Sequence, residues 1–241
     1  MREPPFKNPL VVGYRGEIGS FILTGLLRTM PKAKNIWCFD INETESEKVD
    51  RIKKADVIFL CVPLQDTVKW LCKYKKLLRN KTVIEQTSLK SWIDDKINHK
   101  LLENIHMLSM HILFRPSATP VKDDRKVILI EYGDWQRSSL NRAIEEITEA
   151  KIVWITTYRL HDRLMAYQQA LIHRVLLTLD KTLLGLTGQT YIGKKIKELT
   201  DRIRCGDPAL YSLIQKNKYL HSVMETFNRN LRNFKISKEF K

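Results

Sequence analysis

The chain has 241 residues, 43% of them hydrophobic, and its 42 lysines and arginines against 27 aspartates and glutamates give a formal net charge of +15. This length holds one large domain or two modest ones with ample material for a hydrophobic core. No apolar run has the length of a membrane span and the amino terminus lacks a signal-peptide apolar region, so we expect a cytoplasmic protein without a membrane segment.

An apolar strand near the amino terminus breaks into a turn marked by Gly13, Gly16 and Gly19, and a helix follows. Such a unit presents backbone N–H groups and a helix N-terminus to a pyrophosphate. The spacing is G-x-x-G-x-x-G, because Tyr14 stands where the first glycine of G-x-G-x-x-G is expected. Glycine turns also occur outside nucleotide-binding proteins, so the segments that follow must show whether this turn binds a dinucleotide. The predicted cofactor-binding residues of this turn are Gly13, Arg15, Gly16, Glu17, Ile18 and Gly19.

A second strand is predicted within Asn35–Asn42 and ends at Asp40, 21 residues beyond Gly19. A carboxylate about 20 residues after the glycine turn is where the dinucleotide-binding fold holds the adenosine ribose. Asp40 would also repel a 2′-phosphate, which favours NAD over NADP. The alternative is a turn aspartate that caps the segment after it.

The first half of the chain continues to alternate predicted strands and helices. The third strand, Ala55–Val62, is apolar throughout, as expected for a strand buried on both faces of a parallel sheet. Val62 and Pro63, at its carboxyl end, are predicted to contact the cofactor. The other predicted strands are Thr82–Gln86, Ile105–Met110, Lys126–Tyr132 and Lys151–Ile155, and the predicted helices are Gly19–Met30, Thr44–Lys54, Asp66–Leu78, Ser91–His99 and Ser138–Ala150. This order predicts a doubly wound, Rossmann-like α/β domain over residues 1–156.

Residues 157–241 are predicted to form an all-helical second domain. Leu160–Leu186 is apolar over most of its circumference, which predicts a long helix buried between other helices. Asp207–Pro208 is a helix-start signal for a helix from Ala209 to about Asn233. Between them Tyr191–Ile203 carries an apolar stripe, which consists of Ile192, Ile196, Leu199 and Ile203. We expect this domain to bind substrate and to form a homodimer, since so apolar a first helix needs a partner.

The net charge and the cysteines say little about the partner. Basic residues are spread along the chain, and the densest stretch, Lys69–Lys81, has apolar residues at helical spacing, which indicates a solvated helix face. We therefore do not expect a nucleic-acid site, which stays the alternative; a small polyanionic substrate would also be attracted. Cys38, Cys61, Cys72 and Cys205 lack metal-ligand spacing, so we expect reduced thiols and no metal site.

Two polar residues follow strand ends at the carboxyl edge of the predicted sheet. His111 follows Ile105–Met110, and a neutral imidazole there can accept a hydroxyl proton while hydride leaves the same carbon. Ser88 follows Thr82–Gln86, and its hydroxyl can orient the histidine or the nicotinamide amide. The alternatives are a histidine bound to loop carbonyls and a serine that caps the next helix.

In the helical half, His161, Met165, Gln169 and His173 fall on one helix face at intervals of four residues. His161, at the helix start, is the one predicted to lie near a cleft, and His173 is predicted to form hydrogen bonds in the core. Arg202 flanks the apolar stripe of its helix and can bind a carboxylate with two hydrogen bonds. The alternative is an arginine that only covers apolar surface.

The chain resembles the prephenate dehydrogenases, including the dehydrogenase domain found fused to chorismate mutase. The most specific likeness is the pattern H-D-x-x-M-A-x-x-Q-A-L-x-H within Leu160–Leu179, followed by Asp201–Ile214. The glycine turn, the apolar third strand, Ser88–Lys90 and the His111 segment also follow in the family's order. The resemblance implies NAD-dependent oxidative decarboxylation of prephenate, a dicarboxylate, to 4-hydroxyphenylpyruvate in tyrosine biosynthesis, without a metal.

The resemblance also implies roles for single residues. His111 matches the catalytic histidine, which binds the ring hydroxyl, and Ser88 matches the serine near that histidine and the nicotinamide. Arg202 matches the arginine that binds a substrate carboxylate, and His161 matches a histidine near the substrate pocket. Lys194 falls where some members carry another arginine. In the implied reaction the ring loses hydride and a proton, and CO₂ departs as the ring becomes aromatic.

Several positions depart from the family pattern. Ile112 and Arg115 replace a proline and a glycine after the histidine, Tyr14 replaces a turn glycine, and the chain ends at Lys241, earlier than many relatives. These departures leave open arogenate or a 4-amino analogue as the substrate. They also leave open a homologue that binds NAD without turnover.

Overall fold

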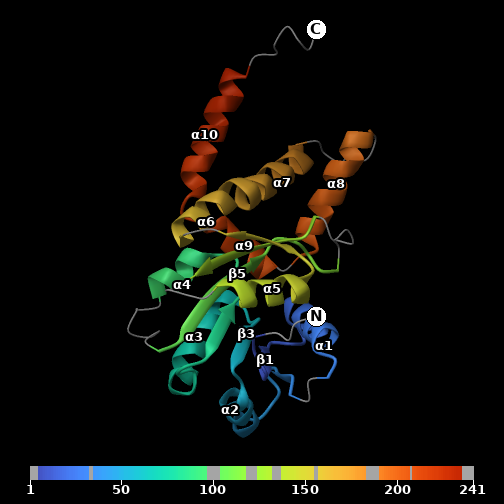
Figure 1. The fold of residues 1–241 in the computed structure, drawn as a ribbon. Coiled ribbons are helices and arrows are strands. Elements are labelled where there is room, and N and C mark those ends of the chain that lie inside the picture. The colour runs from blue at the N-terminus through green and yellow to red at the C-terminus, as the bar shows by residue number, and fades with distance from the viewer. Residues whose placement is uncertain are drawn as a thin grey trace. The chain divides into compact units, whose positions relative to one another are not determined.

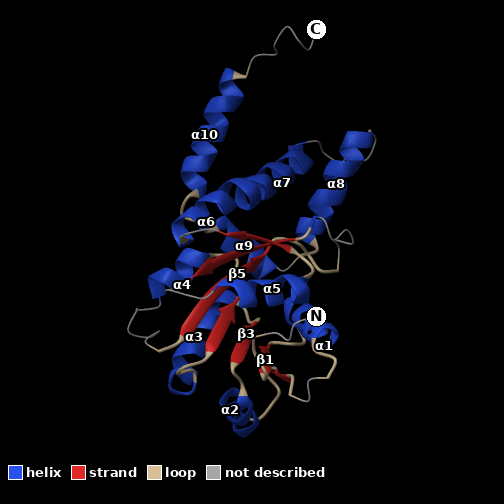
Figure 2. Cartoon of the chain, in the orientation of Figure 1, coloured by secondary structure: helices blue, strands red, loops and turns tan. Residues whose placement is uncertain are grey.

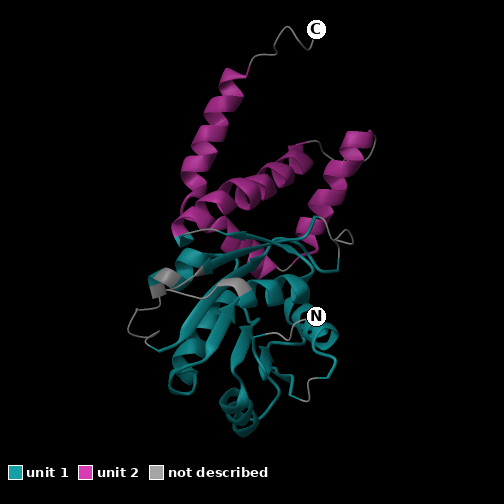
Figure 3. Cartoon of the chain, viewed as in Figure 1, with its two compact units in different colours: residues 1–158 teal, residues 159–241 magenta. Residues whose placement is uncertain are grey.

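The structure is a computed structural model that describes residues 5–32, 35–96, 104–117, 124–131, 137–154, 157–182, 190–206 and 208–234. The chain divides into two compact units, Met1–Tyr158 and Arg159–Lys241 (Figure 3). None of the helices in the described ranges has the length and apolar character needed to cross a membrane. Within the same ranges, no group of three or more His, Cys, Asp or Glu side chains is placed to hold a metal ion.

The first unit is built around a seven-stranded sheet (Figures 1 and 2). Its strands are β1 (Pro9–Val12), β2 (Trp37–Phe39), β3 (Val57–Leu60), β4 (Thr82–Glu85), β5 (His106–Ile112), β6 (Lys126–Glu131) and β7 (Lys151–Trp154). Their spatial order is β2-β1-β3-β4-β5-β6-β7, and the pairing is parallel except between β5 and β6. The chain turns from one side of β1 to the other between β2 and β3, so β1 and β3 flank the topological switch point where such sheets bind ligands.

Helices join the strands of this unit and cover the sheet. They are α1 (Glu17–Thr29), α2 (Glu45–Lys54), α3 (Leu64–Tyr74), which continues into the 3₁₀ turn Lys75–Leu77, α4 (Lys90–Lys96) and α5 (Arg137–Thr148). The polar helix α2 forms because Thr44 and Glu47 make a capping box, each side chain bonding the other's backbone N–H. α1 packs against α5, and a side chain at Gly25 would collide with the Ile147 carbonyl.

One hydrophobic core joins the sheet to α1 and α5. It contains buried residues of β1, β3, β4, β5 and β6 together with Ile22 and Leu26 of α1 and Ile144 and Ile147 of α5. Because the central strands are apolar and buried, the sheet is rigid and its carboxyl edge holds the loops in fixed positions. The predicted Rossmann-like domain is therefore confirmed.

The second unit is helical in its described residues, as predicted. Its elements are α6 (Tyr158–Met165), a π-helical segment (Ala166–Leu171), α7 (Ile172–Thr182), α8 (Tyr191–Arg204), α9 (Pro208–Gln215) and α10 (Leu220–Asn233). The buried Ala170, Ile214 and Leu220 pack together where the π-helical segment meets α9 and α10.

The predicted long helical stretch from Leu160 is continuous as far as Thr182, but it differs from the prediction in two respects. A π-helical segment interrupts the α-helix, and the Gln215 amide donates a hydrogen bond to the buried Ala170 carbonyl of this segment at 3.1 Å. π-Helical turns are rare and concentrate at functional sites. In addition, none of the α7 residues is buried within this chain, although the sequence predicts burial.

The prediction of one helix from Ala209 to Asn233 was also wrong. The chain leaves the helix between α9 and α10, where Asn217 is buried. The Asn217 side chain accepts a hydrogen bond from the Tyr219 N–H at 3.0 Å and donates to the Asp162 carbonyl at 2.7 Å. An asparagine that bonds backbone groups in this way favours a turn over a helix.

Other predicted boundaries differ by a few residues from the observed ones. The most important is that β5 runs to Ile112, so His111 lies inside the strand and not in the loop after it. The predicted ends at His99, Tyr132, Ile155 and Leu186 and the predicted helix start at Asp207 lie outside the described residues.

Candidate functional site

The glycine turn connects β1 to α1 at the switch point of the sheet. Gly13 has a φ of 79°, and a side chain there would collide with the Cys61 carbonyl at the end of β3. A side chain at Gly19 would collide with the Gly13 carbonyl. Gly16 is different, because the nearest atom to an added Cβ would be 3.5 Å away, an ordinary contact. The packing of the turn thus requires Gly13 and Gly19, whereas Gly16 leaves the outer side of the turn open to a ligand.

Asp40 lies against this turn, just beyond the end of β2. Its carboxylate accepts hydrogen bonds from the Arg15 N–H at 3.1 Å and the Ile41 N–H at 2.8 Å. The residue that caps the following helix α2 is Thr44, so capping that helix is not the role of Asp40. The structure therefore places the predicted ribose-binding carboxylate beside the predicted pyrophosphate-binding turn.

The side chains of the turn differ in what they contact. Arg15 extends over the Tyr14 ring, with its guanidinium carbon 5.5 Å from the ring centroid, and its Nε donates to the Tyr14 hydroxyl at 3.1 Å. That hydrogen bond raises the pKa of Arg15. Ile18 packs against the hydrophobic core, so only its backbone faces the turn.

Glu17, in the first turn of α1, is bound by the segment that follows β5. Its Oε1 accepts hydrogen bonds from the Ser117 N–H at 3.1 Å and the Ser117 hydroxyl at 2.6 Å. Its Oε2 accepts one from Arg115 Nε at 3.2 Å. Partial burial opposes ionisation, but these hydrogen bonds and the Arg115 charge outweigh it and lower the pKa of Glu17. Arg115, a departure from the family pattern, thus neutralises a carboxylate at the start of α1.

Val62 and Pro63 follow β3 and lead into α3, whose N-cap is Pro63. An added Cβ on Gly13 would lie 3.4 Å from a Val62 methyl carbon, so Val62 borders the glycine turn. The predicted cofactor-binding residues of the first unit therefore gather around the carboxyl ends of β1, β2 and β3.

His111 is buried in β5, one residue before the strand ends, with 4% of its surface exposed. Side chains alternate between the two faces of a strand. Leu108, Met110 and Ile112 belong to the hydrophobic core shared with α1 and α5. Ser109 and His111 therefore point to the opposite face of the sheet.

Sequence reasoning missed a buried ionic cluster on that face. Glu85, the last residue of β4, and Lys90, the first of α4, are both fully buried and pair at 2.8 Å. Glu85 also accepts a hydrogen bond from the Ser109 hydroxyl. Thr87 donates two more to Glu85, from its N–H at 2.7 Å and from its hydroxyl at 2.6 Å. Lys90 donates to the Met110 carbonyl at 2.8 Å.

This cluster fixes the chain on both sides of Ser88 and directly before His111, the two predicted catalytic residues. It holds Thr87 and Lys90, which flank Ser88, and Ser109 and Met110, which precede His111. A glutamate that ends an apolar strand, with a lysine five residues later, was the available sequence signal.

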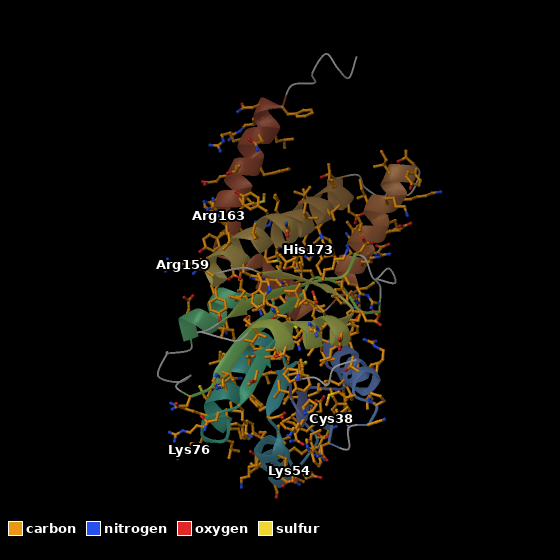
Figure 4. The ribbon with its side chains drawn as sticks, viewed as in Figure 1. Cys38, Lys54, Lys76, Arg159, Arg163 and His173 are labelled. Atoms are coloured by element: carbon orange, nitrogen blue, oxygen red, sulfur yellow. The ribbon has the colours of Figure 1, made fainter. Side chains whose placement is uncertain are left out.

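The predicted substrate-binding residues lie in the second unit. His161 is fully buried on α6, and its Nδ1 lies 2.8 Å from an Asp162 carboxylate oxygen. Lys194 and Arg202 are exposed on α8, eight residues apart and hence on one face of that helix. His173 lies on α7 (Figure 4). Its ring stacks on Tyr211 of α9, with the ring centroids 6.0 Å apart.

Comparisons with known proteins identify the family. The model of the prephenate dehydrogenase nucleotide-binding domain matches residues 24–156, more than half of the chain. No curated protein matches the sequence.

Solved structures similar to this chain share its fold. One is the prephenate dehydrogenase of A. aeolicus in complex with hydroxyphenyl propionate and NAD+, with 20% identity and a TM-score of 0.72 over 96% of this chain and 90% of that chain. The Synechocystis arogenate dehydrogenase has 18% identity and a TM-score of 0.66 over 94% of this chain and 90% of that chain. The Plasmodium falciparum pyrroline carboxylate reductase with NADP bound has 14% identity and a TM-score of 0.54 over 94% of this chain and 91% of that chain.

Proposed function

Because the chain belongs to the prephenate dehydrogenase family, we propose that it catalyses the NAD-dependent oxidative decarboxylation of prephenate to 4-hydroxyphenylpyruvate. The observation that carries the proposal is the place of His111 at the carboxyl end of β5, in the same parallel array as the glycine turn after β1. Dinucleotide and reacting groups meet at this edge of such sheets.

The residues around the glycine turn fit NAD+. The open side of Gly16 and the N-terminus of α1 suit a pyrophosphate, and the Asp40 carboxylate beside the turn suits the ribose hydroxyls and disfavours a 2′-phosphate. Arg15, Val62 and Pro63 border the same site. NAD+, when bound, supplies the hydride acceptor.

The protein's own groups supply proton transfer and orientation. The neutral imidazole of His111 accepts the proton of the ring hydroxyl as the same carbon loses hydride, and the Ser88 hydroxyl orients the imidazole or the nicotinamide amide. The electrons of the bond to the departing carboxylate then complete the aromatic ring, and CO₂ leaves. Arg202 and Lys194 supply cationic groups for the substrate's carboxylates, and His161 lies near the substrate pocket.

An absorbance assay for NADH with the purified protein tests the proposal. Prephenate, arogenate and 4-amino-4-deoxyprephenate are compared by kcat/KM with NAD+. We expect the largest value for prephenate. Turnover of arogenate or the amino analogue alone would assign a different substrate. NAD+ binding without turnover of any of the three acids would indicate a homologue that has lost catalysis.

We also propose that the second unit forms a homodimer. α7 has no buried residue, and in the apolar stripe of α8 Ile192 is 70% exposed and Leu199 45%, beside Tyr191 at 77%. Contiguous apolar surface of this kind marks an interface. Light scattering should give twice the chain mass, and Ile192→Lys should give a monomer. A wild-type monomer at micromolar concentration would refute the dimer.

A further inference from the structure

Gln86 is the first residue after β4, at the carboxyl edge of the sheet. Glu85 pairs with Leu60 in the β3–β4 register, so Gln86 lies beside Cys61, the residue after β3. Its Nε2 donates to the Cys61 sulfur at 3.1 Å. Its Oε1 is buried, and among the described residues it has no hydrogen-bond donor.

The Cys61 thiol determines which end of the Gln86 amide faces it. Burial raises the pKa of Cys61 well above its usual range, so the group is a thiol. Its S–H donates to the Phe59 carbonyl, with sulfur and oxygen 3.8 Å apart. The sulfur is then available to Gln86 only as an acceptor, so the amide NH₂ faces the sulfur and the amide oxygen faces away from it.

The sheet order places Gln86 on the side of the glycine turn opposite Asp40, where the nicotinamide half of a dinucleotide would lie. Asp40 follows β2 on one side of the glycine turn, and Gln86 follows β4 on the other. Strands are spaced about 4.8 Å apart, so the end of β4 lies roughly 10 Å from that of β1, in the direction of His111 on β5. If adenosine bound at Asp40 and the pyrophosphate at the turn, the nicotinamide riboside would lie towards β3 and β4.

We propose that Gln86 is a cofactor-positioning residue whose Oε1 accepts a hydrogen bond from the nicotinamide-riboside half of NAD+. The donors of that half are the ribose hydroxyls and the carboxamide NH₂. Buried carbonyl groups in native proteins almost always have a donor, and bound cofactor supplies one here. The inference rests on the proposed binding of NAD+ at the glycine turn.

Calorimetric titration tests this proposal. The Kd values of NAD+, ADP-ribose and ADP are measured for the wild-type protein, Gln86→Leu and Gln86→Glu. We expect Gln86→Leu to raise the Kd of NAD+ about five- to tenfold, the effect of one hydrogen bond, without changing the Kd of ADP. If Gln86→Leu also binds ADP-ribose more weakly, the hydrogen bond comes from a ribose hydroxyl. If only the affinity for NAD+ falls, it comes from the carboxamide. Gln86→Glu keeps an acceptor and should retain most of the affinity. Asn228→Leu removes an exposed carboxamide of α10 and should change none of the three values.

Thermal unfolding of the ligand-free variants separates this role from a structural one. Gln86→Leu removes a buried acceptor that has no donor among the described residues, together with one weak hydrogen bond to the Cys61 sulfur, so its Tm should change little. A lower Tm with equal weakening of all three ligands would overturn the proposal, and so would an unchanged Kd for NAD+. If the wild-type protein bound none of the three ligands, the cofactor site itself would be refuted, and this inference with it.

Discussion

Lys90 and Glu85 form a salt bridge of 2.8 Å from which solvent is fully excluded. Glu85 ends β4, Lys90 begins α4, and their hydrogen bonds to Ser109 and Met110 extend to β5 directly before His111. Two buried charges are tolerated only when each has its partners, and here both do. The pair therefore determines where the candidate catalytic residues of two neighbouring strands lie.

Lys90→Met should destabilise the protein by about 3–5 kcal/mol, because it leaves the Glu85 carboxylate buried without its counter-charge. Urea unfolding measures this change. The matched control is Lys69→Met, which breaks the exposed pair between Lys69 and Asp66 and should cost less than about 1 kcal/mol. Glu85→Leu combined with Lys90→Met should recover much of the loss. Equal losses of stability in Lys90→Met and Lys69→Met would show that the buried pair contributes no more to stability than an exposed one.

His111→Asn should lower kcat by about two to four powers of ten and leave the Kd of NAD+ unchanged. Asparagine keeps a polar side chain of similar reach but cannot take the hydroxyl proton. Steady-state kinetics and calorimetry measure the two quantities. His106→Asn, at the exposed start of the same strand, is the control and should retain wild-type kcat. A His111→Asn enzyme with normal kcat would remove His111 from the mechanism.

Arg202→Gln should raise the KM of the acid substrate about 10- to 100-fold, with a smaller effect on kcat. The substitution removes a charged hydrogen bond to a carboxylate that is present before and during the reaction. The control is Lys197→Gln on the same helix, where Lys197 pairs with Asp201 at 3.4 Å on the surface. Equal KM values for both variants would contradict a substrate-binding role for Arg202.

Arg115→Ala should weaken NAD+ binding by up to about fivefold. Arg115 pairs with Glu17 in the first turn of α1, so its loss leaves a negative charge where a pyrophosphate is proposed to bind. Glu17→Gln added to Arg115→Ala should restore the affinity. The difference in NAD+ affinity between the wild type and Arg115→Ala should shrink at high salt, because exposed charges are screened. A double variant as weak as Arg115→Ala would show that repulsion by Glu17 is not the cause.

His173 should make the protein less stable as the pH falls below about 6.5. Burial lowers the pKa of His173, and its Nδ1 has no hydrogen-bond partner in the part of the chain that the structure describes. The unfolded chain, with a histidine pKa of about 6.5, therefore binds the proton first. Stability is fully present above that pH and is lost as the pH falls towards the lower pKa of the folded state.

Urea unfolding between about pH 8 and pH 5.5 tests this dependence. His173→Phe keeps an aromatic ring to stack on Tyr211 but cannot take up a proton, so its stability should vary less with pH. The same pH dependence in His173→Phe and wild type would place the titrating group elsewhere.

The sequence by itself determined the features that depend on short-range patterns. The apolar strand and glycine turn at Gly13–Gly19, the buried third strand and the change to an all-helical pattern after residue 156 follow from residue spacing alone. A helix or a buried strand imposes its period on neighbouring residues, so this information is local. Asp40 was also found by its distance from the turn, and the structure places it there.

Only the tertiary structure decided the contacts that join distant segments. Glu85 meets Ser109 across 24 residues, and Glu17 meets Ser117 across 100. It also decided that α7 is not buried within the chain, that Asn217 lies in the break between α9 and α10, and that the buried Gln86 oxygen has no donor among the residues that the structure describes. These features depend on which groups become neighbours when the sheet forms, and the spacing of residues along the chain does not carry that information.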